Sequence, residues 1–504
     1  MNTMESLLHH LGLGFSVAYS FSNLLFCFIG VVIGTLIGVL PGIGPAGTIA
    51  MLLPVSYRMD PVSAIIMMAG IYYGAQYGGS TTSILLNIPG EASSVITCLD
   101  GYQMARTGRA GPALGISAFG SFIGGTLSVV GLMLLAPLLV QLALKFGPAE
   151  FFALMVFGLT MIAYLGSGSL IKSLLMGTAG LFLSTVGMDP VSGIIRFTFG
   201  SITLSDGVGM IPVAMGMFGL AEVLENLEEE IHREVFKTRL HSLLPTLKDW
   251  IDSRWAIVRG TIVGFFLGML PGGSTALPTF IAYGLEKRFS KYPERFGTGV
   301  IEGVAGPETA NNAATGSAMI PLLCLGIPAN VAMAVLLGAF ILHGIQPGPL
   351  LMGKHPQLFW GTIASMYIGN VMLLILNLPL IGLWVQILKI PYRILFPLII
   401  LFCFVGSYCL SNNGYDVLIM VIFGTIGYIM RKYRYEGAPF LLALILGPML
   451  EISFRQALII GDPLIFFRKP ISASFLGFAF LLLILRPLLK IMRKGIEYFK
   501  RIQN

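Results

Sequence analysis

The stretch NLLFCFIGVVIGTLIGVLPGIGPAG, Asn23 to Gly47, decides the class of fold. Its first part carries no charged residue up to Leu40 and is long enough to cross most of a bilayer as a helix. The glycines that follow spell G-x-G-x-x-G, which is also the dinucleotide-binding fingerprint. That fingerprint needs a preceding strand and an acidic residue about 20 residues further on, and the nearby acid, Asp60, comes too early. We therefore interpret these glycines as part of a membrane segment.

Composition extends this interpretation to the whole chain. The 504 residues are 55% hydrophobic and only 11% charged, against about 25% charged in an ordinary soluble domain. Long apolar runs recur throughout and predict an all-α polytopic membrane protein with about 10–12 transmembrane helices, some of them broken or re-entrant. The five cysteines show no metal-ligand spacing and no Walker A motif occurs, so we expect no cofactor, no ATP hydrolysis and no enzyme activity.

Basic residues predict the orientation, because Lys and Arg are enriched in cytoplasmic loops. Residues 1–57 contain neither, whereas 233–259 and 486–501 are rich in both. We therefore expect an outward N-terminus, and a cytoplasmic linker and C-terminus.

Two halves of the chain repeat each other. GTLIGVLPGIGPA, from Gly34, matches GFFLGMLPGGSTA, from Gly264. LLNIPGEAS, from Leu85, then resembles CLGIPANVA, from Cys324, and LDGYQ resembles LHGIQ in the same order. If the halves start on opposite sides of the membrane, they form an inverted repeat, as in many secondary transporters. We expect a first membrane repeat at 1–221, an amphipathic cytoplasmic linker at 222–255, a second repeat core at 256–388, and C-terminal helices with a basic tail at 389–504.

Polar tracts follow the L-P-G motif of each half. Polar groups at membrane depth are costly unless they face protein or water, so both tracts predict a cavity, although small-residue helix packing is the alternative. No Lys or Arg lies between Arg58 and Arg106 or between Arg295 and Lys354, so an anion would meet helix N-termini, hydroxyls and amides. The candidate substrate-binding residues are Ser80, Thr81, Thr82, Asn87, Asn311, Asn312, Thr315 and Ser317.

A second set of candidates concerns a coupling ion. Amide, hydroxyl and unwound backbone oxygens are ligands that suit Na⁺, so Na⁺ is a possible bound ion. Glu91 and Glu308 flank the tracts and can cap helices, exchange a proton or lie exposed in loops. We also expect Asn87 and Asn311 at opposed hairpin tips near the bilayer midplane. The candidate ion-binding or coupling residues are Gly42, Gly272, Asn87, Asn311, Glu91 and Glu308.

The motifs together resemble the large membrane subunit of tripartite tricarboxylate transporters, the TctA-type family. The resemblance rests on GVLPGIGPAGTIAMLLP, YGAQYGGSTTSILLNIPGEASSV, GMLPGGSTALPTFIAYGLEKR and GVAGPETANNAATGSAMIPLLCLGIP, among others. It implies a bacterial inner-membrane symporter that works with a small four-helix membrane subunit and a periplasmic solute-binding protein. It also implies carboxylate uptake driven by a Na⁺ or H⁺ gradient. The alternative is a passive channel or a scaffold subunit of a membrane complex.

Overall fold

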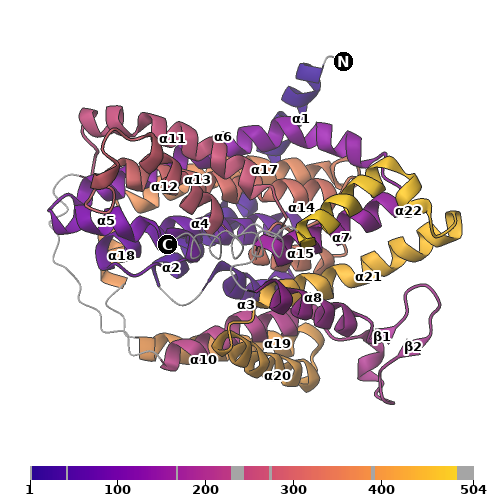
Figure 1. Cartoon of the computed structure of the whole chain (residues 1–504). Coiled ribbons are helices and arrows are strands. Elements are labelled where there is room, and N and C mark those ends of the chain that lie inside the picture. Colours follow the sequence, from indigo (N-terminus) through magenta and orange to yellow (C-terminus); the bar gives the residue numbers. More distant parts are fainter. Residues whose placement is uncertain are drawn as a thin grey trace, which may run out of the picture. The chain divides into compact units, whose positions relative to one another are not determined.

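The structure is a computed structural model that describes residues 3–40, 44–165, 169–228, 243–271, 275–387 and 392–484. The all-α prediction is confirmed, since the described residues are helical apart from one short β-hairpin and loops (Figure 1). The chain forms two compact units, Met1–Leu144 with Gly209–Lys432 and Lys145–Val208 with Tyr433–Asn504. These units reflect packing rather than the sequence repeat, so the predicted segment boundaries stay a prediction.

Seven helical segments of the described chain are long and apolar enough to span a membrane, and five shorter apolar helices accompany them. The predicted total of spans and re-entrant segments stays a prediction. The seven are α2 (Phe21–Val39), α6 (Ala110–Ala143), α7 (Pro148–Leu165), Met210–Glu228, α17 (Pro356–Asn377), α20 (Gly414–Lys432) and α21 (Gly437–Ile460).

The segment Met210–Glu228 consists of α9 (Met210–Ala214), η3 (Met215–Leu220) and α10 (Ala221–Glu228). The larger unit also contains, in chain order, α1 (Thr3–Ala18), α3 (Pro45–Ser56), α4 (Pro61–Leu86), η1 (Ala92–Ser94), α5 (Thr97–Arg106), α11 (Leu247–Gly268), α12 (Ala276–Phe289), η4 (Pro293–Arg295), α13 (Glu302–Ser317), α14 (Met319–Leu325), α15 (Val331–Leu342), α16 (Leu351–Lys354), α18 (Ile381–Ile387) and α19 (Tyr392–Ser411). The described ends of the predicted linker belong to α10 and α11, and its role as a linker stays a prediction.

Helix α2 packs closely on α4 through glycines spaced four residues apart. A Cβ atom on Gly30, Gly34 or Gly38 would lie 2.1–2.5 Å from a backbone oxygen of α4. Residues at this spacing share one helix face, and small residues let membrane helices approach closely. The uncharged stretch quoted above therefore supplies both a membrane span and its contact with α4.

Helix α11 packs on α13 in the same way. A Cβ atom on Gly260, Gly264 or Gly268 would lie 2.2–2.4 Å from a backbone oxygen of α13. Gly264 and Gly268 are the residues that the sequence repeat matches to Gly34 and Gly38. One packing contact therefore occurs twice in the larger unit, while the inverted orientation of the halves stays a prediction.

The two halves meet where α4 contacts α13, with α6 packed on α13 and α17 packed on α4. Almost every residue of α4 is buried, and every residue of α13 from Gly303 to Ser317 is buried. Helices α11, α12 and α13 lie side by side in Figure 1. This packing places the polar tracts of both halves inside the larger unit.

The smaller unit consists of α7, α8 (Leu170–Ser184), β1 (Gly187–Met188), β2 (Ile195–Arg196), η2 (Thr203–Asp206), α21, α22 (Ile465–Arg468) and a helix at Pro470–Ile484. Strands β1 and β2 pair antiparallel (Figure 1). Arg196 joins the hairpin to α21 through two hydrogen bonds to Glu451, of 2.8 and 3.0 Å. Hydrogen bonds from the backbone N–H of Val191 and from Ser192 hold the pKa of Asp189 below its usual value.

Candidate functional site

The polar tract of α4 is buried, and its hydroxyls divide into two kinds. Ser80, Thr81 and Thr82 are each at most 3% exposed. Thr82 Oγ1 donates to the backbone oxygen of Gly79 over 3.0 Å, so its own helix satisfies it. Ser80 instead reaches α13, where its hydroxyl donates to Glu308. Packing therefore accounts for Thr82, whereas Ser80 links the two halves.

The tract of α13 divides in the same way. The hydroxyl of Thr315 donates to the backbone oxygen of Asn311 over 2.8 Å, and that of Ser317 donates to Ala314 over 3.2 Å. Both hydroxyls therefore have a backbone acceptor within their own helix, as the alternative of small-residue helix packing predicts. Asn312 is different, because its amide nitrogen donates to Ser121 Oγ of α6 over 2.7 Å.

Glu308 is the carboxylate on which three other elements converge. It is 1% exposed and accepts hydrogen bonds from the hydroxyls of Ser80 on α4, Thr97 on α5 and Ser117 on α6, the last over 3.2 Å. None of the ion pairs within the described residues includes it. Because Glu308 lies inside α13, it neither caps a helix nor lies exposed in a loop.

The repeated stretches LLNIPGEAS and CLGIPANVA each contain an Ile-Pro pair, the I-P motif, which lies just after a helix end. Asn87 follows α4 with φ of 58°, and Gly326 follows α14 with φ of 73°. Glycine and asparagine tolerate this left-handed conformation, so Asn87 corresponds to Gly326. The predicted placement of Asn87 opposite Asn311 at hairpin tips is wrong. Asn87 is exposed at the end of α4, whereas Asn311 lies inside α13, because the second half stays helical through its polar tract and breaks only after α14.

After each break, a polar residue precedes the next helix. Asn330 caps α15, where its Oδ1 accepts from the Met333 N–H over 3.0 Å and its Nδ2 donates to the Tyr72 hydroxyl over 2.8 Å. Glu91 precedes η1 at the matching position, and its backbone N–H donates to Ser94 Oγ over 3.2 Å. The capping interpretation of Glu91 therefore holds for its place in the chain, while its side chain packs beside Gly79 of α4.

Among the candidate site residues that the structure describes, three buried polar atoms lack a hydrogen-bond partner. They are Nδ2 and Oδ1 of Asn311 and Oε1 of Glu91. Leaving a buried polar atom unpaired costs about 1–3 kcal/mol, and such atoms are rare enough in proteins to need an explanation. A bound ligand with both a donor and an acceptor would satisfy the amide of Asn311.

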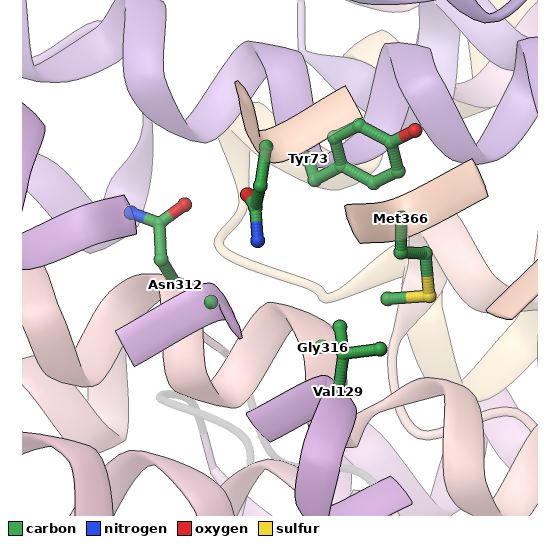
Figure 2. Close-up of a pocket in the computed structure, with 7 residues that line it drawn as sticks. Tyr73, Val129, Asn312, Gly316 and Met366 are labelled. Carbon is green, nitrogen blue, oxygen red and sulfur yellow. The ribbon is translucent and has the colours of Figure 1, made fainter. Parts of the chain in front are cut away.

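A small cavity lies beside this cluster, between residues from both halves. Figure 2 shows Tyr73 of α4, Val129 of α6, Asn312 of α13 and Met366 of α17 around it. Gly125, Gly316 and Asn370 complete its lining. About 10 Å³ is accessible to the centre of a water-sized sphere, which is room for about one water molecule. The cavity is therefore too small for an organic acid in this conformation.

Gly42 and Gly272 lie outside the described residues, so their predicted role stays a prediction. Next to the first of them, the Gly44 N–H donates to Glu222 Oε1 over 2.9 Å. Glu222 in turn pairs with Arg431 of α20 at 3.4 Å. An acid and a base thus hold the chain where α3 begins after the L-P-G motif.

Sequence reasoning missed three residues that organise the site. Thr97 and Ser117 donate to Glu308. Asp100 is fully buried and accepts from three backbone N–H groups of the loop before α13 and from the Tyr283 hydroxyl. The signal for Asp100 was present, since it lies in the LDGYQ motif that marked the repeat. Nothing local distinguishes Thr97 or Ser117 from other helical hydroxyls.

Comparison with known proteins gives consistent matches. The family model described as "Tripartite tricarboxylate transporter TctA family" matches residues 24–442. One relative in Agrobacterium vitis, named "Uncharacterized 52.8 kDa protein in TAR-I ttuC' 3'region", is 51% identical over 97% of this chain and 98% of its own length. Another from the same organism, named "Uncharacterized protein in TAR-II ttuC' 3'region", is 52% identical over 47% of this chain and 98% of its own length. No solved structure gives a significant match.

Proposed function

The chain belongs to the tripartite tricarboxylate transporter TctA family, and from this premise we propose that it is the large membrane subunit of a secondary transporter. In this proposal it takes up an organic carboxylate, a tricarboxylate or a related acid, across the bacterial inner membrane. A periplasmic solute-binding protein delivers the substrate, and a small four-helix membrane subunit completes the complex. A gradient of Na⁺ or H⁺ drives uptake, and the C-terminus faces the cytoplasm.

One observation supports ion-coupled transport above the other possibilities. The buried polar cluster between α4 and α13 contains the acid Glu308, and no described Lys or Arg pairs with it. A substrate carboxylate that enters this cluster adds further negative charge, and like charges at short distance disfavour ionisation together. A proton or Na⁺ that enters with the substrate removes this repulsion. The charge of the site therefore supports the proposal of symport.

The proposal is tested with purified protein in proteoliposomes, using citrate, succinate and benzoate as probes. With the small subunit and the binding protein present, we expect at least one probe to show counterflow and to accumulate under an ion gradient. Without the binding protein, uptake should fall to a small fraction, because that protein concentrates and orients the substrate. Equal uptake without it would refute the tripartite proposal. Downhill flux without counterflow or accumulation would instead indicate a passive channel.

The unpartnered amide of Asn311 gives a second test, in which stability and affinity move in opposite directions. Asn311→Ala removes no side-chain hydrogen bond, because neither amide atom has a partner, so the folded protein should be as stable or slightly more stable. If the amide binds substrate or ion, the loss of a hydrogen bond to a charged group costs about 1.5–3 kcal/mol, or about 10- to 150-fold in half-saturation. Initial uptake rates against substrate and against Na⁺ measure this.

Two control variants accompany this test. Asn312→Ala breaks the bond to Ser121 and should lower stability. Asn87→Gly keeps the left-handed C-cap and should leave stability nearly unchanged, so any change in uptake reports on its amide. If Asn311→Ala leaves both half-saturation constants and the maximal rate unchanged, Asn311 takes no part in binding.

A further inference from the structure

We infer that the coupling ion is a proton, that Glu308 carries it, and that Ser80 with the backbone oxygen of Gln76 lets the site stay hydrogen-bonded both with and without that proton. This inference rests on the proposed function, because it names the ion and the residue that couple transport. It is carried by the arrangement of hydroxyls around one buried carboxylate at the contact between the two halves.

In the ionised state both carboxylate oxygens of Glu308 accept hydrogen bonds. Thr97 donates to Oε1, and Ser80 and Ser117 donate to Oε2. An ionised carboxylate only accepts hydrogen bonds, and a hydroxyl has one proton to give. Three hydroxyls from α4, α5 and α6 therefore replace the water that the carboxylate would otherwise bind.

The protonated state of Glu308 is also fully hydrogen-bonded, because Ser80 has two acceptors for its single proton. Its Oγ lies 3.2 Å from the backbone oxygen of Gln76 and also contacts Glu308 Oε2. When one proton binds Oε2, the new O–H of Glu308 donates to Ser80 Oγ, and Ser80 turns its own proton to Gln76. Thr97 and Ser117 keep their acceptors. One O–H bond forms, no other covalent bond changes, and no polar group is left unpaired.

Among the residues that the structure describes, no Lys or Arg pairs with Glu308 to hold it ionised. Tyr77 of α4 and Cys98 of α5 interact electrostatically with Glu308, and neither side chain carries a positive charge. The next acid, Glu286 of α12, lies beside Gly306 and is paired with Arg259 of α11 through a bond of 2.7 Å. Asp100 of α5 is bonded to the loop before α13. Glu302, at the start of α13, carries the same charge as Glu308.

A site of this kind fits proton exchange linked to movement of the halves. Ser80 and Thr97 belong to the first half and Glu308 to the second, so sliding of α13 against α4 and α5 would separate the carboxylate from its donors. An ionisable group inside a membrane protein commonly marks a proton pathway. Loss of the donors favours the neutral, protonated acid, which ties the proton to one conformation.

The first test does not depend on the substrate. Infrared difference spectra between acid and neutral pH should show the carbonyl band of a protonated carboxyl group in the wild-type protein. Glu308→Gln should lose that band, whereas Glu302→Gln, a change on the same helix, should keep it. If the band is unchanged in Glu308→Gln, Glu308 does not exchange a proton and the inference is wrong.

The second test measures coupling in proteoliposomes with the small subunit and the binding protein present, using the probe that shows counterflow. A gradient of one pH unit should give the wild-type protein up to about tenfold accumulation per coupled proton. Glu308→Gln imitates the protonated state, so it should keep counterflow but accumulate no probe. Glu308→Asp retains a carboxyl group and should restore accumulation at a lower rate, which also guards against a folding defect in the Gln variant.

Three outcomes would overturn the inference. They are accumulation by Glu308→Gln under a pH gradient, wild-type accumulation under a Na⁺ gradient alone, and absence of accumulation by Glu308→Asp. Failure of the proposed function looks different, because the wild-type protein would then show no counterflow with any probe, or would take up a probe equally well without the binding protein. The infrared test would still decide whether Glu308 titrates.

Discussion

Gly38→Ala is expected to lower the stability of the protein by about 3 kcal/mol, although in an ordinary helix the same change is mildly stabilising. A Cβ atom on Gly38 would lie 2.1 Å from the backbone oxygen of Ala75 and 2.9 Å from the backbone nitrogen of Gly79. Both atoms belong to the backbone of α4, so no side chain can move aside to relieve the contact. The helices themselves must separate.

The balance of two energies decides whether Gly38→Ala stabilises or destabilises the protein. Alanine gains about 0.5–1 kcal/mol over glycine in a helix interior, whereas overpacking a tight contact costs typically about 1–3 kcal/mol and sometimes more. Gly38 also contacts the I-P-G turn, since a Cβ atom on Gly90 would lie 2.2 Å from the Gly38 oxygen. We therefore expect a loss of about 3 kcal/mol, a large part of the roughly 5–15 kcal/mol that stabilises a typical protein.

The measurement is the yield and thermal midpoint of the monodisperse protein in detergent. Gly284→Ala is the matched control, because Gly284 lies in α12 with no atom within 4 Å of the Cβ position, and it should be neutral or slightly stabilising. Gly264→Ala should behave like Gly38→Ala, since its Cβ would lie 2.2 Å from the Ala310 oxygen. Equal midpoints for Gly38→Ala and Gly284→Ala would show that α2 does not pack tightly on α4.

The helical membrane class could be predicted from the sequence, and so could the match of Gly264 and Gly268 to Gly34 and Gly38. The close helix contacts that both sets of glycines form are seen only in the structure. The I-P motifs marked the repeat in the sequence, and the structure shows that α4 and α14 end just before them, at Leu86 and Leu325. Such features depend on local spacing and backbone conformation, which one sequence records directly.

The site was harder to predict because its contacts join residues far apart in the chain. Glu308 was named from its position beside a polar tract, but its donors Thr97 and Ser117 lie on other helices and carry no local signal. The misplacement of Asn311 has a related cause. Asn87 and Asn311 were both placed at hairpin tips because each lies in the polar tract of its half, whereas the backbone shows that the breaks correspond at Asn87 and Gly326. The two halves must therefore be aligned once by their polar tracts and once by their helix breaks.

Asp100→Asn is expected to loosen the loop that leads into α13 and to lower stability by about 3 kcal/mol. The carboxylate accepts from the backbone N–H groups of Gly297, Gly299 and Val300 over 2.8–3.0 Å, and from the Tyr283 hydroxyl over 2.9 Å. The asparagine amide keeps the shape, but one of its two ends becomes a donor. That end faces N–H groups instead of accepting from them.

The expected loss follows from what remains unpaired. Hydrogen bonds to charged groups contribute about 1.5–3 kcal/mol each, and a buried donor left unpaired costs about 1–3 kcal/mol. Gly297 and Gly299 have φ of 90° and 104°, so the loop adopts a conformation that few residues tolerate and that the carboxylate helps to hold. Asp252→Asn is the control, because Asp252 is exposed on α11 and its change should shift stability by less than about 0.5 kcal/mol.

The consequence for the site distinguishes this prediction from a general loss of stability. The loop at 297–300 positions the start of α13, and α13 carries Glu308 to its donors on α4, α5 and α6. Hydrogen exchange should therefore accelerate first in residues 297–303 of Asp100→Asn and then along α13, while α2 keeps its protection. Uniform acceleration across both halves would indicate that Asp100 only stabilises the protein as a whole. Unchanged exchange in the loop would show that other contacts hold it.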